Sequence, residues 1–193
     1  MLIHPGRLAA AAAVALLLAA GTGCARWPAS QRTAARAIAS PSPSASPCAP
    51  EPGAGFPPLL VGFDERLATE PTVVAGPAEP GDLQVSVLIQ GACSVVTPGQ
   101  TITTNYVGAT LRDGKVFDSS WSRHATVDVV VGLAQLGRTS EVIEGWDRGL
   151  IGVRVGSRVQ LDIPARMAYG TDPSPGTPAG SLRFVVDVLD ART

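Results

Sequence analysis

The stretch that decides the fold reads NYVG at 105–108, GKVFDSS at 114–120, EVIEGWDRG at 141–149, IP at 163–164 and AYG at 168–170. Each segment places aromatic or β-branched apolar residues beside one or two polar ones. Ligand pockets have this composition, because apolar walls exclude water while a few polar groups orient the ligand. The region from 103 to 169 therefore predicts both the centre of the fold and a pocket.

Around this region the pattern predicts a mainly antiparallel sheet. Asp113-Gly114 is typical of a two-residue hairpin turn in which both central positions take positive φ, so Tyr106 and Phe117 should lie on neighbouring strands. A short helix is expected at 144–150, packed on the sheet, and the fold class is α+β. Alternating or β-branched runs indicate strands at 83–89, 101–111, 115–119, 126–131, 155–163 and 181–189.

The segment before the first strand, 59–80, is interpreted as an irregular lead-in that packs on the sheet. Thr72–Val74 is rich in β-branched residues and is expected to form a short edge strand. Three prolines in the same segment interrupt any longer strand.

The first 58 residues differ in composition from the rest. An apolar run at 8–20 is too short to span a bilayer and is typical of a secretory signal peptide. Small residues then lead to Cys24, as in a bacterial lipobox, where the cysteine becomes lipidated, although Gly21 replaces the usual Leu. A Pro/Ser tract at 40–50 indicates an extended linker. The expected organisation is a signal peptide (1–23), a lipid-anchored Pro/Ser-rich linker (24–58) and one domain (59–193).

The sequence leaves two alternatives open for the localisation of the protein and two for the state of its remaining cysteines. Lipid on Cys24 would tether the domain to the outer face of the cytoplasmic membrane, whereas ordinary cleavage after a small residue would release a secreted protein. Export places the remaining cysteines in an oxidising compartment. Cys48 and Cys93 therefore form either a disulfide or two free thiols.

Composition and motifs argue against several classes of function. The chain of 193 residues has a net charge of −1, which gives no basic face for a nucleic acid. No glycine-rich phosphate loop follows a strand, and no Cys/His cluster has metal-ligand spacing. A Ser/His hydrolase would depend on His124 alone, with no nucleophile motif around any serine. We expect no cofactor and no metal.

The motifs together resemble the FKBP-type peptidyl-prolyl cis-trans isomerases, in particular exported actinobacterial members. The resemblance spans about 83–189 and rests on several motifs in the family's order. It implies a twisted antiparallel β-sheet of about five to six strands wrapped around one short α-helix. The matching motifs are YVG at 106–108, DGKVFDSS at 113–120, EVIEGW at 141–146, GSR at 156–158, AYG at 168–170 and LRFVVD at 182–187.

The resemblance also implies a role for each pocket residue. The backbone N–H of Ile143 and the hydroxyl of Tyr169 are expected to bind substrate carbonyls, and Asp118 to orient its neighbours or favour the twisted amide electrostatically. The residues expected to take part in catalysis are Tyr106, Phe117, Asp118, Ile143, Trp146 and Tyr169. Those expected to bind substrate are Arg123, Val127, Val129, Val142 and Phe184.

Three departures from the family pattern affect the pocket. Val127 stands where the family has a second pocket phenylalanine, which thins that wall. The segment 133–140 is longer than the compact family version. The flap at 171–180 lacks the bulky isoleucines that many members place over the pocket. The resemblance therefore implies turnover of small peptides, whereas these departures weaken the expectation of tight binding to macrolide inhibitors.

Two functions fit these residues. One is an active isomerase that accelerates rotation about Xaa-Pro bonds in exported proteins; the other is a non-catalytic chaperone or scaffold module that binds Pro-containing segments. Both imply proline-containing polypeptides as partners, no nucleic acid, and a membrane contact only through the lipid anchor. Nothing in the sequence indicates oligomerisation, a client protein or a preferred residue before proline.

Overall fold

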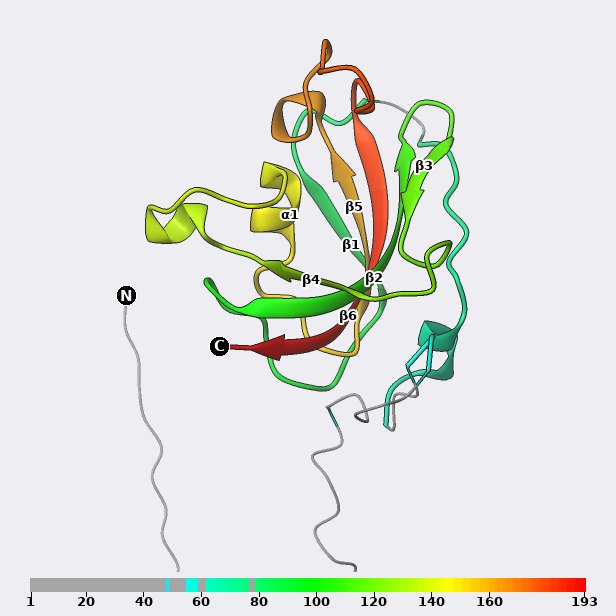
Figure 1. Ribbon diagram of the computed structural model, residues 1–193, viewed down its shortest axis with the longest axis vertical. Coiled ribbons are helices and arrows are strands. Elements are labelled where there is room, and N and C mark those ends of the chain that lie inside the picture. Colours follow the sequence, from blue (N-terminus) through cyan, green and yellow to red (C-terminus); the bar gives the residue numbers. More distant parts are fainter. Residues whose placement is uncertain (1–47, 49–54, 59–61, 77–78) are drawn as a thin grey trace, which may run out of the picture. The chain divides into compact units, whose positions relative to one another are not determined.

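The computed structural model describes Cys48 and residues 55–58, 62–76 and 79–193. In this part of the chain a six-stranded antiparallel sheet packs against one α-helix, α1 (Glu144–Gly149), as Figure 1 shows. This confirms the α+β class. The strands are β1 (Gln84–Ile89), β2 (Thr101–Thr110), β3 (Val116–Ser119), β4 (Val127–Val130), β5 (Arg158–Ile163) and β6 (Leu182–Arg192). Three short 3-10 helices, which the sequence did not indicate, are η1 (Glu65–Ala68), η2 (Ala134–Leu136) and η3 (Ala165–Met167).

The strand order is β1-β5-β6-β2-β3, and β4 pairs with β2 beside this path. β6 is central, and its residues from Leu182 to Leu189 are all buried. On β6, Leu182, Phe184 and Val186 belong to the core cluster that also contains Trp146 of the helix. Side chains on a strand alternate between faces, so the residues between them point to the opposite face. Both faces of this strand are therefore covered.

The helix is short and is held by packing rather than by helix propensity. Its Trp146 and Leu150, just beyond the last helical residue, are both buried, as the spacing predicted. Gly145 lies against β5, where a Cβ atom would approach Ile163 Cγ2 to 2.5 Å. A glycine normally weakens a helix interior, but here it allows the helix to approach the sheet closely.

The hairpin between β2 and β3 differs from the expected two-residue turn. Only Gly114 has positive φ (68°), and Asp113 does not. The strands first pair where the Thr110 N–H donates to the Lys115 carbonyl, so the loop spans 111–114. The Thr110 hydroxyl donates to the Asp113 carboxylate within this loop. Tyr106 and Phe117 nevertheless lie on paired strands, as predicted.

The lead-in does not contain the expected edge strand at Thr72–Val74. Instead, residues 62–76 consist of η1 followed by chain without regular secondary structure. We call this segment the strap; it lies on the opposite side of the sheet from α1 (Figure 1). Its carbonyl groups accept hydrogen bonds from arginine side chains rather than from a neighbouring strand. Arg158 donates to Thr69 O (2.8 Å), and Arg183 donates to Val74 O (2.9 Å).

Two arginine–aspartate pairs beneath the strap are buried. Arg158 binds Asp187 through two hydrogen bonds of 2.6 and 2.8 Å, and Arg183 binds Asp162 through two of 2.6 and 2.7 Å. These pairs join β5 to β6. Each guanidinium therefore links two strands and the strap at once, and this accounts for the covered second face of β6.

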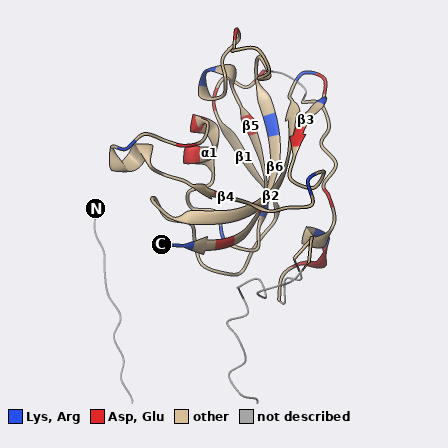
Figure 2. Cartoon of the chain, in the orientation of Figure 1, with Lys and Arg blue, Asp and Glu red and all other residues tan. Residues whose placement is uncertain are grey.

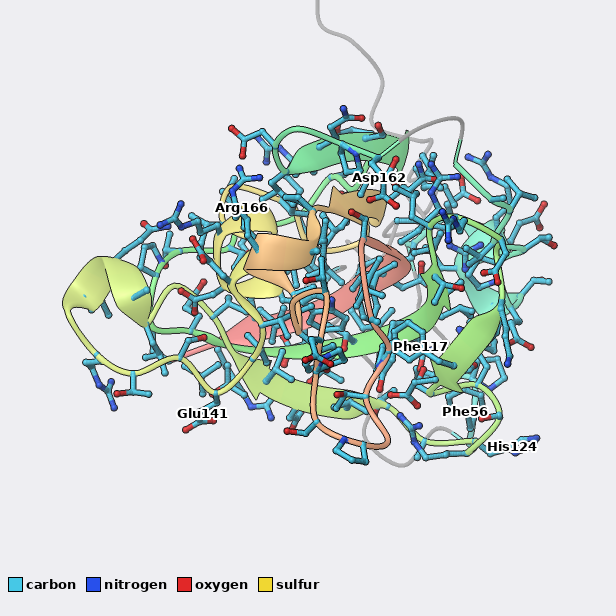
Figure 3. The ribbon with its side chains drawn as sticks, turned by 90° about the horizontal axis from the view of Figure 1, so that it is seen from above. Phe56, Phe117, His124, Glu141, Asp162 and Arg166 are labelled. Carbon is cyan, nitrogen blue, oxygen red and sulfur yellow. A yellow bond between two sulfur atoms is a disulfide. The ribbon has the colours of Figure 1, made fainter. Side chains whose placement is uncertain are left out.

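The folded unit also begins earlier than residue 59. The Phe56 ring packs edge-on against Trp121 at 5.2 Å between centroids and against His124 at 5.9 Å (Figure 3). Cys48 is joined to Cys93 by a disulfide. Part of the expected linker thus packs on the domain. Cys24 and the expected signal peptide lie outside the described residues, and no helix within the described part has the length and apolarity to cross a membrane.

Candidate active site

Four aromatic rings from four different elements form the centre of the site. They are Tyr106 of β2, Phe117 of β3, Trp146 of α1 and Phe184 of β6. The indole of Trp146 meets Tyr106 at 5.2 Å and Phe184 at 5.4 Å between centroids, and Phe117 meets Phe184 at 5.6 Å. All three contacts are edge-to-face, the arrangement that aromatic quadrupoles favour. Gly108 lies directly beneath two of the rings, where a Cβ atom would come within 2.6 Å of Phe184 and 3.0 Å of Phe117.

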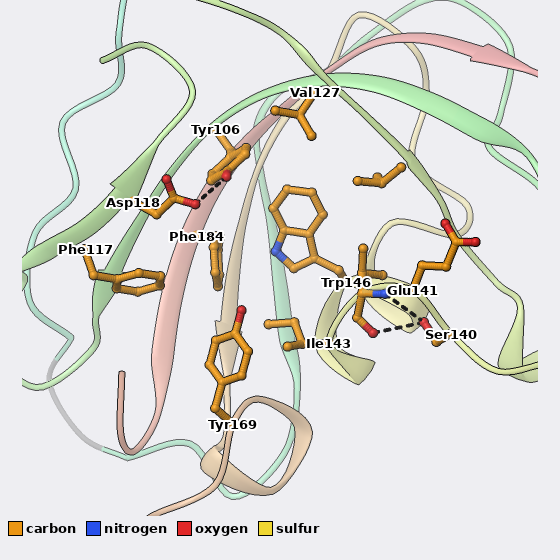
Figure 4. Close-up of a pocket in the computed structure, with 12 residues that line it drawn as sticks. Tyr106, Phe117, Asp118, Val127, Ser140, Glu141, Ile143, Trp146, Tyr169 and Phe184 are labelled. Carbon is orange, nitrogen blue, oxygen red and sulfur yellow. Dashed lines mark hydrogen bonds between the residues drawn. The ribbon is translucent and has the colours of Figure 1, made fainter. Parts of the chain in front are cut away.

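These rings bound a cavity of about 380 Å³, open on one side (Figure 4). Its size is within the range of small-molecule sites. Ten of the eleven residues that the sequence suggested for the site line the cavity, including Val127 and Val129 of β4. The lining residues are Tyr106, Phe117, Asp118, Val127, Val129, Ser140, Glu141, Val142, Ile143, Trp146, Tyr169 and Phe184.

The remaining suggested residue, Arg123, lies behind the lining rather than in it. Its guanidinium donates to the Asp118 carboxylate and, over 2.9 Å, to the Tyr106 hydroxyl. The Tyr106 hydroxyl in turn donates to the other Asp118 oxygen. Arg123 therefore acts on the cavity as a positioning residue, through Asp118 and Tyr106, and its expected contact with substrate stays a prediction.

This triad sets the ionisation of the site. Burial pushes the pKa of Asp118 upward, but the hydrogen bonds from Tyr106 and Arg123 outweigh it and hold the pKa below its ordinary value. Asp118 is therefore a carboxylate throughout the neutral range. Burial, together with the hydrogen bond to Asp118, raises the pKa of Tyr106, and burial together with the charge of Asp118 raises the pKa of Tyr169. Both tyrosines thus keep their hydroxyl protons.

The hydrogen-bond donors at the cavity that have no acceptor among the described residues include the buried indole N–H of Trp146, the Tyr169 hydroxyl and the Ile143 N–H. The Tyr169 side chain rises from the end of η3 into the opening, with its hydroxyl directed at the cavity (Figure 4). Ile143 is the residue before α1, with extended backbone (φ −59°, ψ 149°), and its N–H precedes the helical hydrogen-bond pattern. Helix starts leave such donors unsatisfied, so both groups are free to bind a ligand's oxygen atoms.

The sequence analysis missed two lining residues, Ser140 and Glu141, and the buried carboxylate that positions them. Asp147 of α1 accepts hydrogen bonds from Leu133 N–H (3.0 Å), Ala134 N–H (3.1 Å) and the Ser140 hydroxyl (3.0 Å). Asp147 is fully buried. It thus fixes both ends of the segment 133–140 to the helix. Its only sequence signal was its position one residue after Trp146, where an acidic residue early in a helix suits the helix dipole.

No residue of the flap at 171–180 lines the cavity. The flap is closed at its base by a hydrogen bond from Gly180 N–H to Gly170 O (2.9 Å), and most of its side chains are exposed. In the described part of the chain no group of three or more His, Cys, Asp or Glu could hold a metal ion. Charges of both signs are scattered over the domain (Figure 2). The cavity thus suits a class of protein that binds a small apolar group flanked by carbonyl oxygens.

Comparison with known proteins identifies this class. The family model described as FKBP-type peptidyl-prolyl cis-trans isomerase matches residues 93–189. An FK506-binding protein of Streptomyces anulatus is 37% identical over 117 residues, which cover 59% of this chain and 90% of the relative. A peptidyl-prolyl cis-trans isomerase of Saccharomyces cerevisiae is 32% identical over 128 residues, or 63% of this chain and 89% of the relative. The crystal structure of FkpA from Escherichia coli aligns with a TM-score of 0.49 and 32% identity, covering 66% of this chain and 55% of that one.

The chain therefore belongs to the FKBP-type peptidyl-prolyl cis-trans isomerase family. Its function is the cis-trans isomerisation of peptidyl-prolyl bonds, as the resemblance of its motifs implied.

Proposed function

We propose that this isomerase is an exported protein, tethered by lipid on Cys24, that accelerates rotation about Xaa-Pro bonds in proteins that fold outside the cytoplasm. The apolar run at 8–20 and the small residues before Cys24 support export and anchoring. The Cys48–Cys93 disulfide supports an oxidising compartment, because such bonds are rare in the cytosol.

The reaction explains why the cavity is mostly apolar. Amide resonance sets a barrier of about 18–20 kcal/mol to rotation, and the uncatalysed change takes tens to hundreds of seconds. A planar amide is more polar than a twisted one, so water favours the planar ground state. Walls such as Trp146 and Phe184 remove that preference by excluding water from the bond. An acceleration of about 10⁵-fold would require these effects to supply roughly 7 kcal/mol.

The polar groups of the site hold the substrate in the twisting geometry. We assign the N–H of Ile143 and the hydroxyl of Tyr169 to two carbonyl oxygens of the substrate, with the proline ring over Trp146. The Asp118 carboxylate, held by Tyr106 and paired with Arg123, supplies a fixed local dipole at the cavity wall. No proton is transferred and no covalent bond forms. The observation that carries this assignment is that the Ile143 N–H and the Tyr169 hydroxyl, both without an acceptor among the described residues, lie at one apolar cavity.

A protease-free assay of Xaa-Pro peptide isomerisation tests the assignment. Tyr169→Phe removes one hydrogen bond and should lower kcat/KM about tenfold. Asp118→Val should also lower it, while the free energy of unfolding changes little because the carboxylate is partly exposed. Asp128→Val is the matched control, since Asp128 pairs with Arg192 away from the cavity. Equal turnover in all three variants would remove Tyr169 and Asp118 from the mechanism.

The same assay tests macrolide binding. We propose that family macrolides inhibit this protein weakly, because Val127 thins one wall and no flap residue reaches the cavity. Val127→Phe should lower the inhibitory concentration, and Val129→Phe provides a comparison on the same strand. An inhibitor that acts equally on both variants and the parent would contradict this explanation.

Anchoring is tested by fractionation of cells that produce the full chain. The protein should be found with the membrane and carry a lipid on Cys24 by mass spectrometry. Cys24→Ala should leave it as a soluble exported protein or as an uncleaved precursor. An unmodified protein in the cytoplasm would contradict export.

A further inference from the structure

The cavity has an uncompensated charge. Two of its twelve lining residues are ionisable at neutral pH, Asp118 and Glu141, and both are acidic. The charge of Asp118 is balanced by Arg123, and its two oxygens accept from Arg123 and Tyr106. Glu141 forms no ion pair in the described part of the chain. The net charge that a ligand meets at the cavity is therefore that of Glu141.

The basic residues near Glu141 in sequence do not neutralise it. Arg148 pairs with Glu144 across one helical turn, at 3.0 Å. Arg138, three residues earlier, makes no salt bridge to Glu141. Glu141 is itself exposed and stands at the rim of the cavity (Figures 3 and 4). Its carboxylate is thus available to a substrate residue outside the apolar cavity.

The backbone that carries Glu141 is held in place. The Ser140 hydroxyl oxygen lies 3.0 Å from both Val142 O and Asp147 Oδ1, so these two acceptors share its single proton, and the Val142 N–H donates to the same oxygen (3.3 Å). Glu141 lies between Ser140 and Val142, so these hydrogen bonds fix its backbone on both sides. It is also two residues before Ile143, whose N–H we assign to a substrate carbonyl. A charge fixed this close to the bound backbone acts on a side chain next to the proline.

We propose that Glu141 determines substrate specificity, favouring lysine or arginine beside the proline and disfavouring glutamate or aspartate there. This inference rests on the isomerase function and on the pocket proposed above. The apolar walls strengthen the effect, because low-dielectric surfaces focus the field of a single charge into a cavity. Exposure and salt limit it, so an effect of about threefold for each sign of substrate charge is expected at low ionic strength.

The test uses peptides Ala-Xaa-Pro-Phe with Xaa lysine, glutamine or glutamate, and a second set with these residues after the proline. We expect kcat/KM for lysine to exceed that for glutamate by about tenfold in at least one set, and added salt to reduce the ratio. Glu141→Gln should bring the ratio close to one, and Glu141→Lys should invert it. Glu144→Gln is the matched control and should leave the ratio unchanged, because Glu144 is paired and lies outside the lining.

Turnover of the uncharged glutamine peptide distinguishes a failure of the specificity proposal from a failure of the isomerase function. If the folded parent protein turns over the glutamine peptide but Glu141→Lys leaves the lysine-to-glutamate ratio unchanged in both sets, the specificity proposal is wrong. If the folded parent turns over none of the peptides, the isomerase function fails and this proposal fails with it. A change in ratio that Glu144→Gln reproduces would show a general effect of surface charge and would also overturn the role of Glu141.

Discussion

Arginine–aspartate pairs occur on both sides of this domain, and their burial differs sharply. The side chains of Arg158 and Asp187, beneath the strap, are 9% and 0% exposed, whereas those of Arg123 and Asp118, at the cavity, are 45% and 39% exposed. A buried pair leaves a costly unpaired charge when one partner is removed, but an exposed pair contributes little to stability. The same pairing of arginine with aspartate therefore stabilises the fold beneath the strap and positions polar groups at the cavity.

The largest expected effect comes from breaking a buried pair. Asp187→Ala should lower the free energy of unfolding by about 3–5 kcal/mol, because Arg158 is left buried without its carboxylate. Burial raises the pKa of Asp187 to about 6, so urea unfolding should be measured at pH 7, where the pair is ionised. Asp128→Ala, which breaks an exposed pair, should cost about 1 kcal/mol or less. Similar losses in the two variants would remove the distinction between the pairs.

A smaller loss of stability should come from replacing either of two glycines, one on each side of the sheet, with alanine. Gly76 in the strap would place a Cβ atom 2.5 Å from Leu111 Cδ1, and Gly108 would place one 2.6 Å from Phe184. Each Gly→Ala change should cost about 1–3 kcal/mol through overpacking. Only Gly108→Ala should lower kcat/KM of the folded protein, since it displaces cavity walls. A loss of turnover in folded Gly76→Ala would show that the strap also shapes the cavity.

The smallest effect on stability is expected at the exposed Arg123–Asp118 pair. The main effect of breaking this pair should be on the pH dependence of kcat/KM. Arg123→Met should alter the free energy of unfolding by less than about 1 kcal/mol. It should raise the pKa of Asp118, because burial is then opposed only by the hydrogen bonds from Tyr106 and from the Ser119 backbone. As the pH falls from 7, kcat/KM should therefore start to decline at a higher pH in the variant than in the parent protein. Superimposable profiles would contradict the positioning role of Arg123.

The sign of the stability effect at this pair follows from the same shift. A carboxyl group whose pKa is lowered in the folded state contributes stability above the pKa of the unfolded chain, near 4. That contribution disappears as the pH falls through the lower folded-state pKa. The parent protein should thus retain it to a more acidic pH than Arg123→Met.

The side of the sheet that carries the cavity could be predicted from the sequence far better than the side beneath the strap. Strand patterns, the helix at Trp146 and ten lining residues followed from local composition and from several family motifs in order. On β6, by contrast, Arg183 and Asp187 alternate with apolar residues and have the pattern of a solvent-facing side. Nothing local indicates that residues more than 80 positions earlier cover them. The edge strand wrongly expected at Thr72–Val74 has the same cause, since the Arg183 side chain rather than a neighbouring strand binds the Val74 carbonyl.

Glu141 and Ser140 were missed for a different reason. Both lie in a matching motif or beside one, but polar residues before a helix are more often caps than pocket walls. Their position depends on Asp147, whose three acceptor contacts arise only when the segment 133–140 folds back on the helix. Such a contact has no local sequence signal.

The strap also bears on how this domain can be divided or transplanted. The segment that matches the family begins at residue 93, so a fragment cut there would keep every lining residue of the cavity. It would lack β1, Cys48 and the carbonyls that bind Arg158 and Arg183. Arg183 adjoins Phe184, a wall of the cavity, so a truncation outside the family segment would act on the site through β6. A fragment that keeps these contacts must therefore be longer than the segment that the family model matches.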